Sequence, residues 1–400
     1  MKQTAPGVLA PPSGRAPATD PPPILLDPVL ADPGAASLIE PAIASPVDPA
    51  TASFRALARQ VRAIGLLDRR PGYYRVKITL TLVAFFASWA LLVLVGNSWT
   101  ALAVAPLIGM LFTQLGFIGH DAGHNQVFCS RRRNRVLGLI VGNALIGLSF
   151  GWWVPKHNAH HAHPNEVGRD PDIGEGIAWA ATDRAATDQT GTTDQTGTTD
   201  QTGTTAGPVA LWLTRWQAPL FFPLMLLRSG GMHVLGIQRL AQRRDHASAV
   251  EAALIIAHAA LYLSAVFWVL SPVKALAFIA IQQAVFSVYL GISFAPNHKG
   301  MPIIESGSSA GFARRQVITA RNIRGGPFTT FMLGGLNRQI EHHLFPSMPR
   351  PNLRRVQALV RDFCVATDLG YCEESFAGSF RLIVDGLSDA AAAAAHQRAG

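Results

Sequence analysis

Long apolar stretches alternate with polar connectors along most of the chain, and four of them are long enough to cross a bilayer. A membrane-spanning helix needs about 20 mostly apolar residues. The stretches at about 78–96 and 101–119 are joined by a short polar turn, as are those at about 249–270 and 275–295. The pattern therefore predicts an all-α integral membrane protein with four transmembrane helices in two hairpins.

Two further apolar stretches, 136–154 and 210–227, fit a different role. A single crossing by the first would place the histidines on its two sides in opposite compartments. The second contains Arg215 and two prolines, which a lipid-exposed spanning helix disfavours. We therefore expect both to be interfacial or re-entrant helices at one leaflet.

The distribution of positive charge predicts how the chain is oriented. Of the 34 Lys and Arg residues, only Lys274 lies in the two short turns within the hairpins, and none lies in the four stretches. Positively charged residues concentrate on the cytoplasmic side of membrane proteins. We therefore expect both termini in the cytoplasm. The net charge of +9 then needs no nucleic-acid partner to explain it, and we expect none.

Composition divides the chain into three parts. Residues 1–70 are rich in Pro and Ala and are expected to be a disordered tail and lead-in, and residues 71–365 to form the membrane domain. Within this domain the hexamer TDQTGT occurs three times at 187–204. Its lack of apolar residues predicts a low-complexity surface loop over 187–205 rather than a solenoid. Residues 366–400 are expected to be a C-terminal tail.

Histidines cluster beside the predicted spans. In HDAGH and HNAHH, spacings of three and four residues place the imidazoles on one face of a helix. Single interfacial histidines are usually just hydrogen-bonded, but several such groups on one predicted membrane surface indicate a metal site. The eight candidate ligands are His120, His124, His157, His160, His161, His298, His342 and His343.

The number of imidazoles narrows the choice of metal. Eight are too many for one tetrahedral zinc ion and suit two metal ions. Imidazole favours Zn, Cu, Fe and Ni, and nitrogen-rich iron sites with open positions activate O₂. No HExxH pattern of zinc peptidases is present. Asp121 and Glu341 are expected to orient imidazoles from a second layer, and His163 is a further, weaker candidate for the site.

The motifs GHDAGH, KHNAHHAHPN and GGLNRQIEHHLFPSMPRPNL occur in this order within about residues 70–365. In these motifs the chain resembles the membrane-bound fatty acyl desaturases of the histidine-box di-iron type. Gln339 at the start of the third box resembles the QxxHH subgroup. The resemblance implies a four-span bundle capped by a cytoplasmic helical di-iron domain with interfacial helices. It also implies the eight histidines as ligands, completed by Gln339 or Asn337 directly or through water.

The resemblance further implies an O₂-dependent enzyme that introduces a double bond into a lipid acyl chain. Two iron ions would be the cofactors, O₂ the co-substrate, and acyl-CoA, an acyl carrier or a phospholipid the source of the chain. No HPGG haem motif of a fused cytochrome b5 occurs in the sequence. Electrons are therefore expected from a separate donor such as a ferredoxin or an NADPH-linked reductase. Trp152 and Trp153 are expected either to line a substrate tunnel or to belong to an interfacial aromatic belt.

Two alternatives remain at this point. A hydroxylase, an acetylenase or a sphingolipid-modifying enzyme would share the same histidine boxes and differ only in its product. A non-catalytic metal transporter or sensor would carry charged or histidine residues at mid-membrane. Only His258 meets that description, which disfavours the second alternative.

Overall fold

The computed structural model describes residues 49–173, 212–213, 215–243 and 245–396. Most of the predicted N-terminal tail and the predicted loop at 187–205 lie outside the described residues. In the described part, four helical stretches are long and apolar enough to span a membrane, which confirms the hydropathy prediction. They are α2 (Pro71–Val95), η2 with α3 (Trp99–Ala103 and Val104–Gly123), α10 (His246–Val269) and α11 (Pro272–His298).

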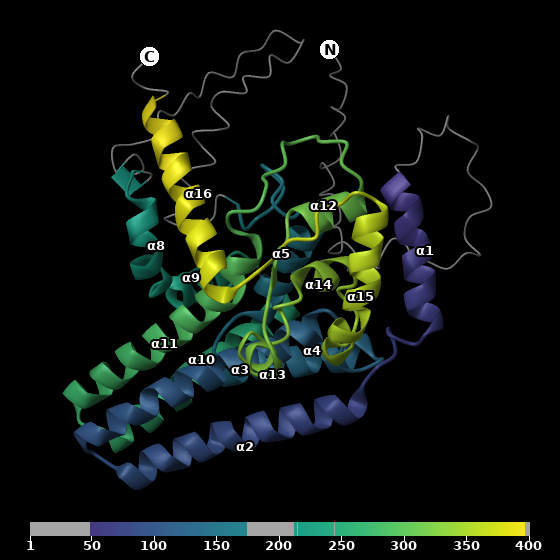
Figure 1. The fold of residues 1–400 in the computed structure, drawn as a ribbon. Coiled ribbons are helices and arrows are strands. Elements are labelled where there is room, and N and C mark those ends of the chain that lie inside the picture. The colour runs from purple at the N-terminus through teal and green to yellow at the C-terminus, as the bar shows by residue number, and fades with distance from the viewer. Residues whose placement is uncertain (1–48, 174–211, 214, 244, 397–400) are drawn as a thin grey trace, which may run out of the picture.

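The spanning helices form one layer of the molecule (Figure 1). Their inner faces meet through buried aromatic residues such as Phe112, Phe278 and Phe286. Their outer faces expose large apolar side chains, including Leu94 and Trp268. Apolar side chains on the outer faces are favourable where the surroundings are lipid. The helical backbone is also suited to lipid, because its polar groups are hydrogen-bonded within each helix. The chain is therefore a multi-pass membrane protein.

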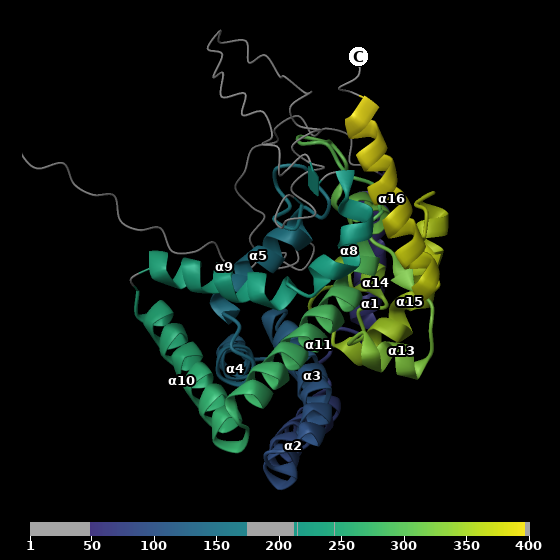
Figure 2. The same cartoon turned by 90° about the vertical axis from the view of Figure 1, so that its left-hand side faces the viewer.

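Neither of the two ambiguous apolar stretches forms a straight span. The segment α4 (Arg131–Gly138) with η3 (Leu139–Leu145) meets α5 (Phe150–Ala162) at 118°, and α8 (Gln217–Met225) meets α9 (Arg228–Gln242) at 73°. Figure 2 shows α9 crossing above α10 and α11, toward α8. These bends agree with the predicted interfacial or re-entrant segments.

The remaining helices form a cap on one side of the spanning layer (Figure 1). Its two short strands pair in parallel, with Asn322 opposite Glu373. The cap elements are α1 (Pro49–Ala63), α12 (Phe312–Ile318), β1 (Asn322–Ile323), α13 (Pro327–Met332), α14 (Gln339–Leu344), α15 (Arg350–Ala366), β2 (Glu373–Glu374) and α16 (Phe376–His396).

The folded part of the chain extends beyond the predicted boundaries at both ends. Helix α1 lies within the expected tail and lead-in, yet Phe54 and Val61 are buried against α12, α14 and α15. Apolar residues spaced by three and four positions in α1 give it this buried face. At the other end, α16 lies within the expected C-terminal tail and packs on α8 through Ile383.

Candidate metal centre

Eight histidines from four helices meet where the spanning layer joins the cap. Helices α3 and α11 continue past their apolar stretches and carry histidines in or just after their last turns. Helix α5 supplies three imidazoles and the single turn of α14 supplies two. The structure therefore brings together the eight candidates named from the sequence: His120, His124, His157, His160, His161, His298, His342 and His343.

Five of them form a first histidine group: His120, His124, His157, His161 and His342. The Nε2 atom of His157 lies 3.2 Å from that of His120, 2.9 Å from that of His124 and 3.1 Å from that of His161. A ring nitrogen donates or accepts one hydrogen bond, so it cannot serve three such partners. Ligand nitrogens about 2.1 Å from a metal ion lie roughly 3 Å apart at right angles. The spacing therefore fits imidazoles arranged around a cation.

The hydrogen-bonding state of His342 supports the same interpretation. This side chain is 1% exposed, and neither of its ring nitrogens has a hydrogen-bond partner among the described residues. Leaving a buried polar atom unpaired costs about 1–3 kcal/mol. A metal ion bound by the group would relieve this cost for one nitrogen. The donor set and its geometry thus fit a metal ion.

A second histidine group consists of His160, His298 and His343, whose ligand atoms all lie within 4.8 Å of one another. His160 Nε2 and His298 Nε2 are 3.4 Å apart. The amide of Gln339 lies 3.0 Å from His298 Nε2, and its other end accepts a hydrogen bond from Asn297. The Gln339 side chain therefore borders this group and contacts one of its imidazoles.

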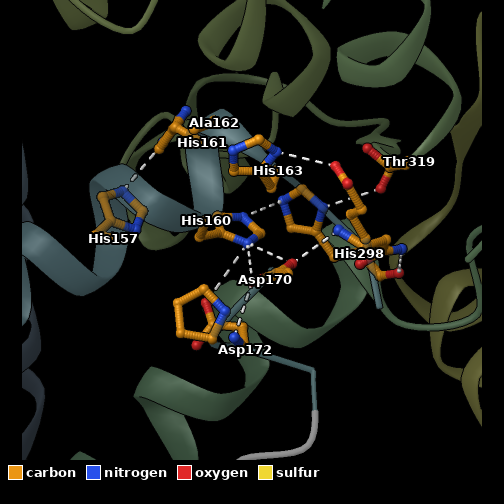
Figure 3. A network of polar contacts seen from close by, with 12 residues as sticks. His157, His160, His161, Ala162, His163, Asp170, Asp172, His298 and Thr319 are labelled. Carbon is orange, nitrogen blue, oxygen red and sulfur yellow. Dashed lines mark hydrogen bonds and ion pairs between the residues drawn. The ribbon is translucent and has the colours of Figure 1, made fainter. Parts of the chain in front are cut away.

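Each imidazole of the second group has an acceptor behind it. His160 Nδ1 lies 2.9 Å from a carboxylate oxygen of Asp170, His298 Nδ1 lies 2.9 Å from the carbonyl oxygen of Thr319, and both contacts are seen in Figure 3. His343 Nδ1 lies 2.8 Å from the amide oxygen of Gln316. Such partners fix the ring and leave Nε2 free to bind a metal. None of these three acceptors was predicted from the sequence.

Burial keeps most of the imidazoles neutral. It lowers the pKa values of His124, His157, His161, His342 and His343 well below the usual range, and the neighbouring histidines add to the effect. His160 is the exception. Burial lowers its pKa, but the carboxylates of Asp170 and Asp172 together outweigh burial, so that the pKa is raised above the ordinary value. Neutral imidazole is the form that binds metals.

The predicted supporting residues differ in what they contact. Asp121 lies 3.5 Å from His120 Nδ1, but its closer partner is Arg350, at 2.6 Å. The prediction for Glu341 is wrong, because its buried carboxylate accepts hydrogen bonds from Asn322 and Tyr371 rather than from an imidazole. These bonds tie α14 to β1 and to the segment before β2.

Asn337 also faces away from the imidazoles. Its side-chain amide contacts the carbonyl oxygen of Ile323, and its oxygen accepts from Arg338. His163, the weaker candidate, lies outside both groups, where its Nδ1 is 2.9 Å from both Glu166 and Arg315.

A cavity of about 330 Å³ runs beside both groups. His120 and His157 of the first group and His160 and His298 of the second contribute to its wall. The remaining wall is largely apolar, and its lining residues include Gly116, Ile146, Leu148, Trp152, Trp153, Phe221, Met232, Leu290 and Phe294. Such a shape suits an apolar chain bound next to a metal centre.

Trp152 and Trp153, which were candidates for either a tunnel or an aromatic belt, both line this cavity. The indole of Trp153 stacks on the imidazole of His157, with ring centroids 4.5 Å apart. Lys156, one turn further along α5, also lines the cavity and pairs with the carboxylate of Asp172. The lining therefore combines a long apolar surface with a charged pair.

Comparison with known proteins gives one consistent family. The family model described as fatty acid desaturase matches residues 97–375. The chain is 32% identical over 355 residues to an acyl-lipid (9-3)-desaturase of Physcomitrium patens, covering 85% of this chain and 64% of that protein. It thus spans less than two thirds of the length of this relative.

Two further relatives carry related names. The Delta(5) fatty acid desaturase fat-4 of Caenorhabditis elegans is 31% identical over 353 residues, which cover 86% of this chain and 74% of the relative. A Delta 8-(E)-sphingolipid desaturase of Komagataella phaffii is 29% identical over 304 residues, with coverages of 74% and 54%. The histidine geometry, the four spans and these similarities lead to one conclusion: this chain belongs to the fatty acid desaturase family.

Proposed function

We propose that the chain is an O₂-dependent desaturase that introduces a double bond into a lipid acyl chain. The observation that carries this proposal is the convergence of eight imidazoles in two groups along an apolar cavity. The first histidine group would hold one iron ion, and the second group with Gln339 would hold the other. Bound iron would supply the oxidising chemistry, driven by O₂ and electrons, that amino-acid side chains lack.

The protein's own residues would align and shield the substrate. The apolar wall of the cavity would hold the acyl chain extended, so that one pair of neighbouring carbons lies beside both histidine groups. Trp153 covers one imidazole of the first group through its stack on His157. By excluding water from this part of the cavity, the indole would protect the reacting carbons from competing reactions.

We further propose that the metal centre faces the cytoplasm and receives electrons from a separate donor. The concentration of Lys and Arg on one side of the predicted spans supports this orientation. The described terminal helices α1 and α16 also lie on the same side of the spanning layer (Figure 1). A ferredoxin or an NADPH-linked reductase would be a suitable donor.

One second candidate function has a specific observation in its favour. Relatives of this chain include proteins named as sphingolipid desaturases. A long-chain base of a sphingolipid presents the same methylene chain to the cavity as a fatty acid does. The substrate pool in which a new double bond appears would separate the two candidates.

The proposal is tested by product analysis of cells that express the intact chain, His161→Ala or the control His163→Ala. His161 belongs to the first histidine group, whereas His163 lies two residues further along and outside both groups. Gas chromatography with mass spectrometry, after derivatisation of double bonds, should find a new unsaturated chain with the intact protein and the control only. A hydroxylated product, or the same product from His161→Ala, would contradict the proposal.

A further inference from the structure

A buried glutamate within a spanning helix holds the segment that leads into α5. Glu251 lies on α10 and is 5% exposed. Its Oε2 atom accepts hydrogen bonds from Asn143 Nδ2 at 3.1 Å, from Ser149 Oγ at 3.0 Å and from the backbone N–H of Gly151 at 2.9 Å. Among the described residues, no Lys or Arg forms an ion pair with Glu251. Hydrogen-bond donors of the segment at 143–151 therefore provide its main stabilisation.

These contacts complete the N-terminus of α5. The first backbone N–H groups of a helix lack partners within the helix. In α5 the N–H of Phe150 donates to Asn143 Oδ1, that of Gly151 to Glu251, and that of Trp152 to Ser149 Oγ. The carboxylate also lies at the positive end of the helix dipole, where negative charge is favoured.

The first turn of α5 depends on this external support more than an ordinary helix does. Pro155 lies inside the helix and has no N–H to donate to the carbonyl four residues earlier. Two histidines also hold the backbone just before this turn. The Nδ1 atom of His233 lies 3.0 Å from the carbonyl oxygen of Gly147, and that of His258 lies 3.1 Å from that of Ala144.

The segment held in this way contributes to both parts of the site. Ile146, Leu148 and Phe150 line the cavity, and all lie between the first and last contacts of Glu251, at Asn143 and Gly151. Helix α5 then continues to His157, about 10 Å further along its axis at 1.5 Å per residue. It carries two imidazoles of the first histidine group and one of the second.

We propose that Glu251 is a positioning residue that fixes α5 relative to the spanning helices, and with it both the metal-binding imidazoles and the adjoining wall of the acyl cavity. The part of this inference that concerns the acyl chain rests on the proposed desaturase function. The part that concerns metal binding rests on the two histidine groups alone. A shift or rotation of α5 would move three imidazoles together, so both histidine groups would respond to one substitution.

The test compares Glu251→Ala, Glu251→Gln and Tyr262→Phe with the intact protein, purified in lipid nanodiscs. Gln keeps an acceptor oxygen at the same position. Tyr262 also lies on α10 and donates a buried hydrogen bond to Gln282 on α11. Tyr262→Phe removes this bond and serves as the matched control. Two quantities are measured per folded protein: Fe(II) affinity by titration with metal analysis, and the distribution of product chain lengths and double-bond positions.

We expect Glu251→Ala to weaken Fe(II) binding by about tenfold or more, as loss of supporting contacts does at other metal sites. The product distribution should broaden. Glu251→Gln should restore part of both properties, and Tyr262→Phe should match the intact protein. If Glu251→Ala does not accumulate, Glu251→Gln alone tests whether Glu251 positions α5. Its Fe(II) affinity should then be measurably lower than that of the intact protein.

Lower protein yield with unchanged Fe(II) affinity and unchanged products per folded molecule would overturn the proposal, because a merely structural role predicts that result. Absence of product from the intact chain, when it is supplied with O₂, an acyl lipid and a reduced ferredoxin or an NADPH-linked reductase, would instead refute the proposed desaturase function. The Fe(II) titration would still report on Glu251 in that case, so the two failures can be told apart.

Discussion

The two histidine groups differ in what surrounds their imidazoles. In the first group the rings mainly contact one another, and His342 has no other polar partner among the described residues. In the second group each ring has a dedicated acceptor on its Nδ1 side, and the amide of Gln339 lies 3.0 Å from the Nε2 atom of His298. The rings of the first group thus have few polar partners other than one another, whereas each ring of the second group has an acceptor of its own.

This difference has a chemical consequence. Five imidazoles around one ion would leave few positions open, whereas three imidazoles and an amide would leave more. Open positions are where small molecules such as O₂ can approach a metal. The acceptors behind the second group would compensate for its smaller number of ligands, because they fix the rings and raise their basicity.

The largest expected effect comes from removing an imidazole of the first group. His342→Ala should lower Fe(II) affinity and product formation by more than about 100-fold, since ligand loss should exceed the loss of supporting contacts. Metal analysis of the purified protein should show about one iron per chain lost. Two irons retained in His342→Ala, with normal product, would show that the first group does not bind metal as described.

Replacing Gln339 should have a smaller effect, confined to the second group. Gln339→Ala should weaken Fe(II) binding by roughly 10–100-fold, because one weak oxygen ligand is lost and three imidazoles remain. Asn337→Ala is the matched control, since this amide lies two residues earlier and faces Ile323 and Arg338. Equal losses in both variants would mean that Gln339 acts only through the fold.

The sequence predicted the spans and the imidazoles because both depend on local spacing. Apolar runs of sufficient length become spanning helices, and histidines three or four positions apart share a helical face. His120 and His124 in HDAGH, and His157 with His161 in HNAHH, follow directly from this periodicity. No knowledge of distant contacts was needed for these elements.

The supporting residues could not be predicted because their contacts arise only when distant segments pack together. Gln316 reaches His343 from α12, and Glu251 reaches Gly151 across 100 positions in the sequence. For Glu341, proximity in the sequence led to a wrong prediction of contact with an imidazole. The residue immediately precedes two candidate ligands, yet neighbouring positions on a helix point about 100° apart, and its carboxylate faces Asn322.

The smallest expected effect tests the supporting contacts themselves. Asp170→Asn keeps the shape of the side chain but removes the charge that lies 2.9 Å from His160 Nδ1. The imidazole becomes a weaker donor to metal, so Fe(II) affinity of the second group should fall by about tenfold. Isothermal titration of the metal-depleted protein, compared with the intact chain, would measure this change.

Glu341→Gln provides the control for Asp170→Asn. It neutralises another buried carboxylate next to the metal centre, one whose partners are Asn322 and Tyr371 rather than an imidazole. Burial raises the pKa of Glu341, so removing its charge should cost less than removing that of Asp170. Fe(II) affinity should therefore remain within about twofold of the intact value. This loss is much smaller than the one expected when a residue that hydrogen-bonds to a metal-binding imidazole is replaced. Equal losses in the two variants would show that general electrostatics, rather than the contact with His160, sets the affinity of the second group.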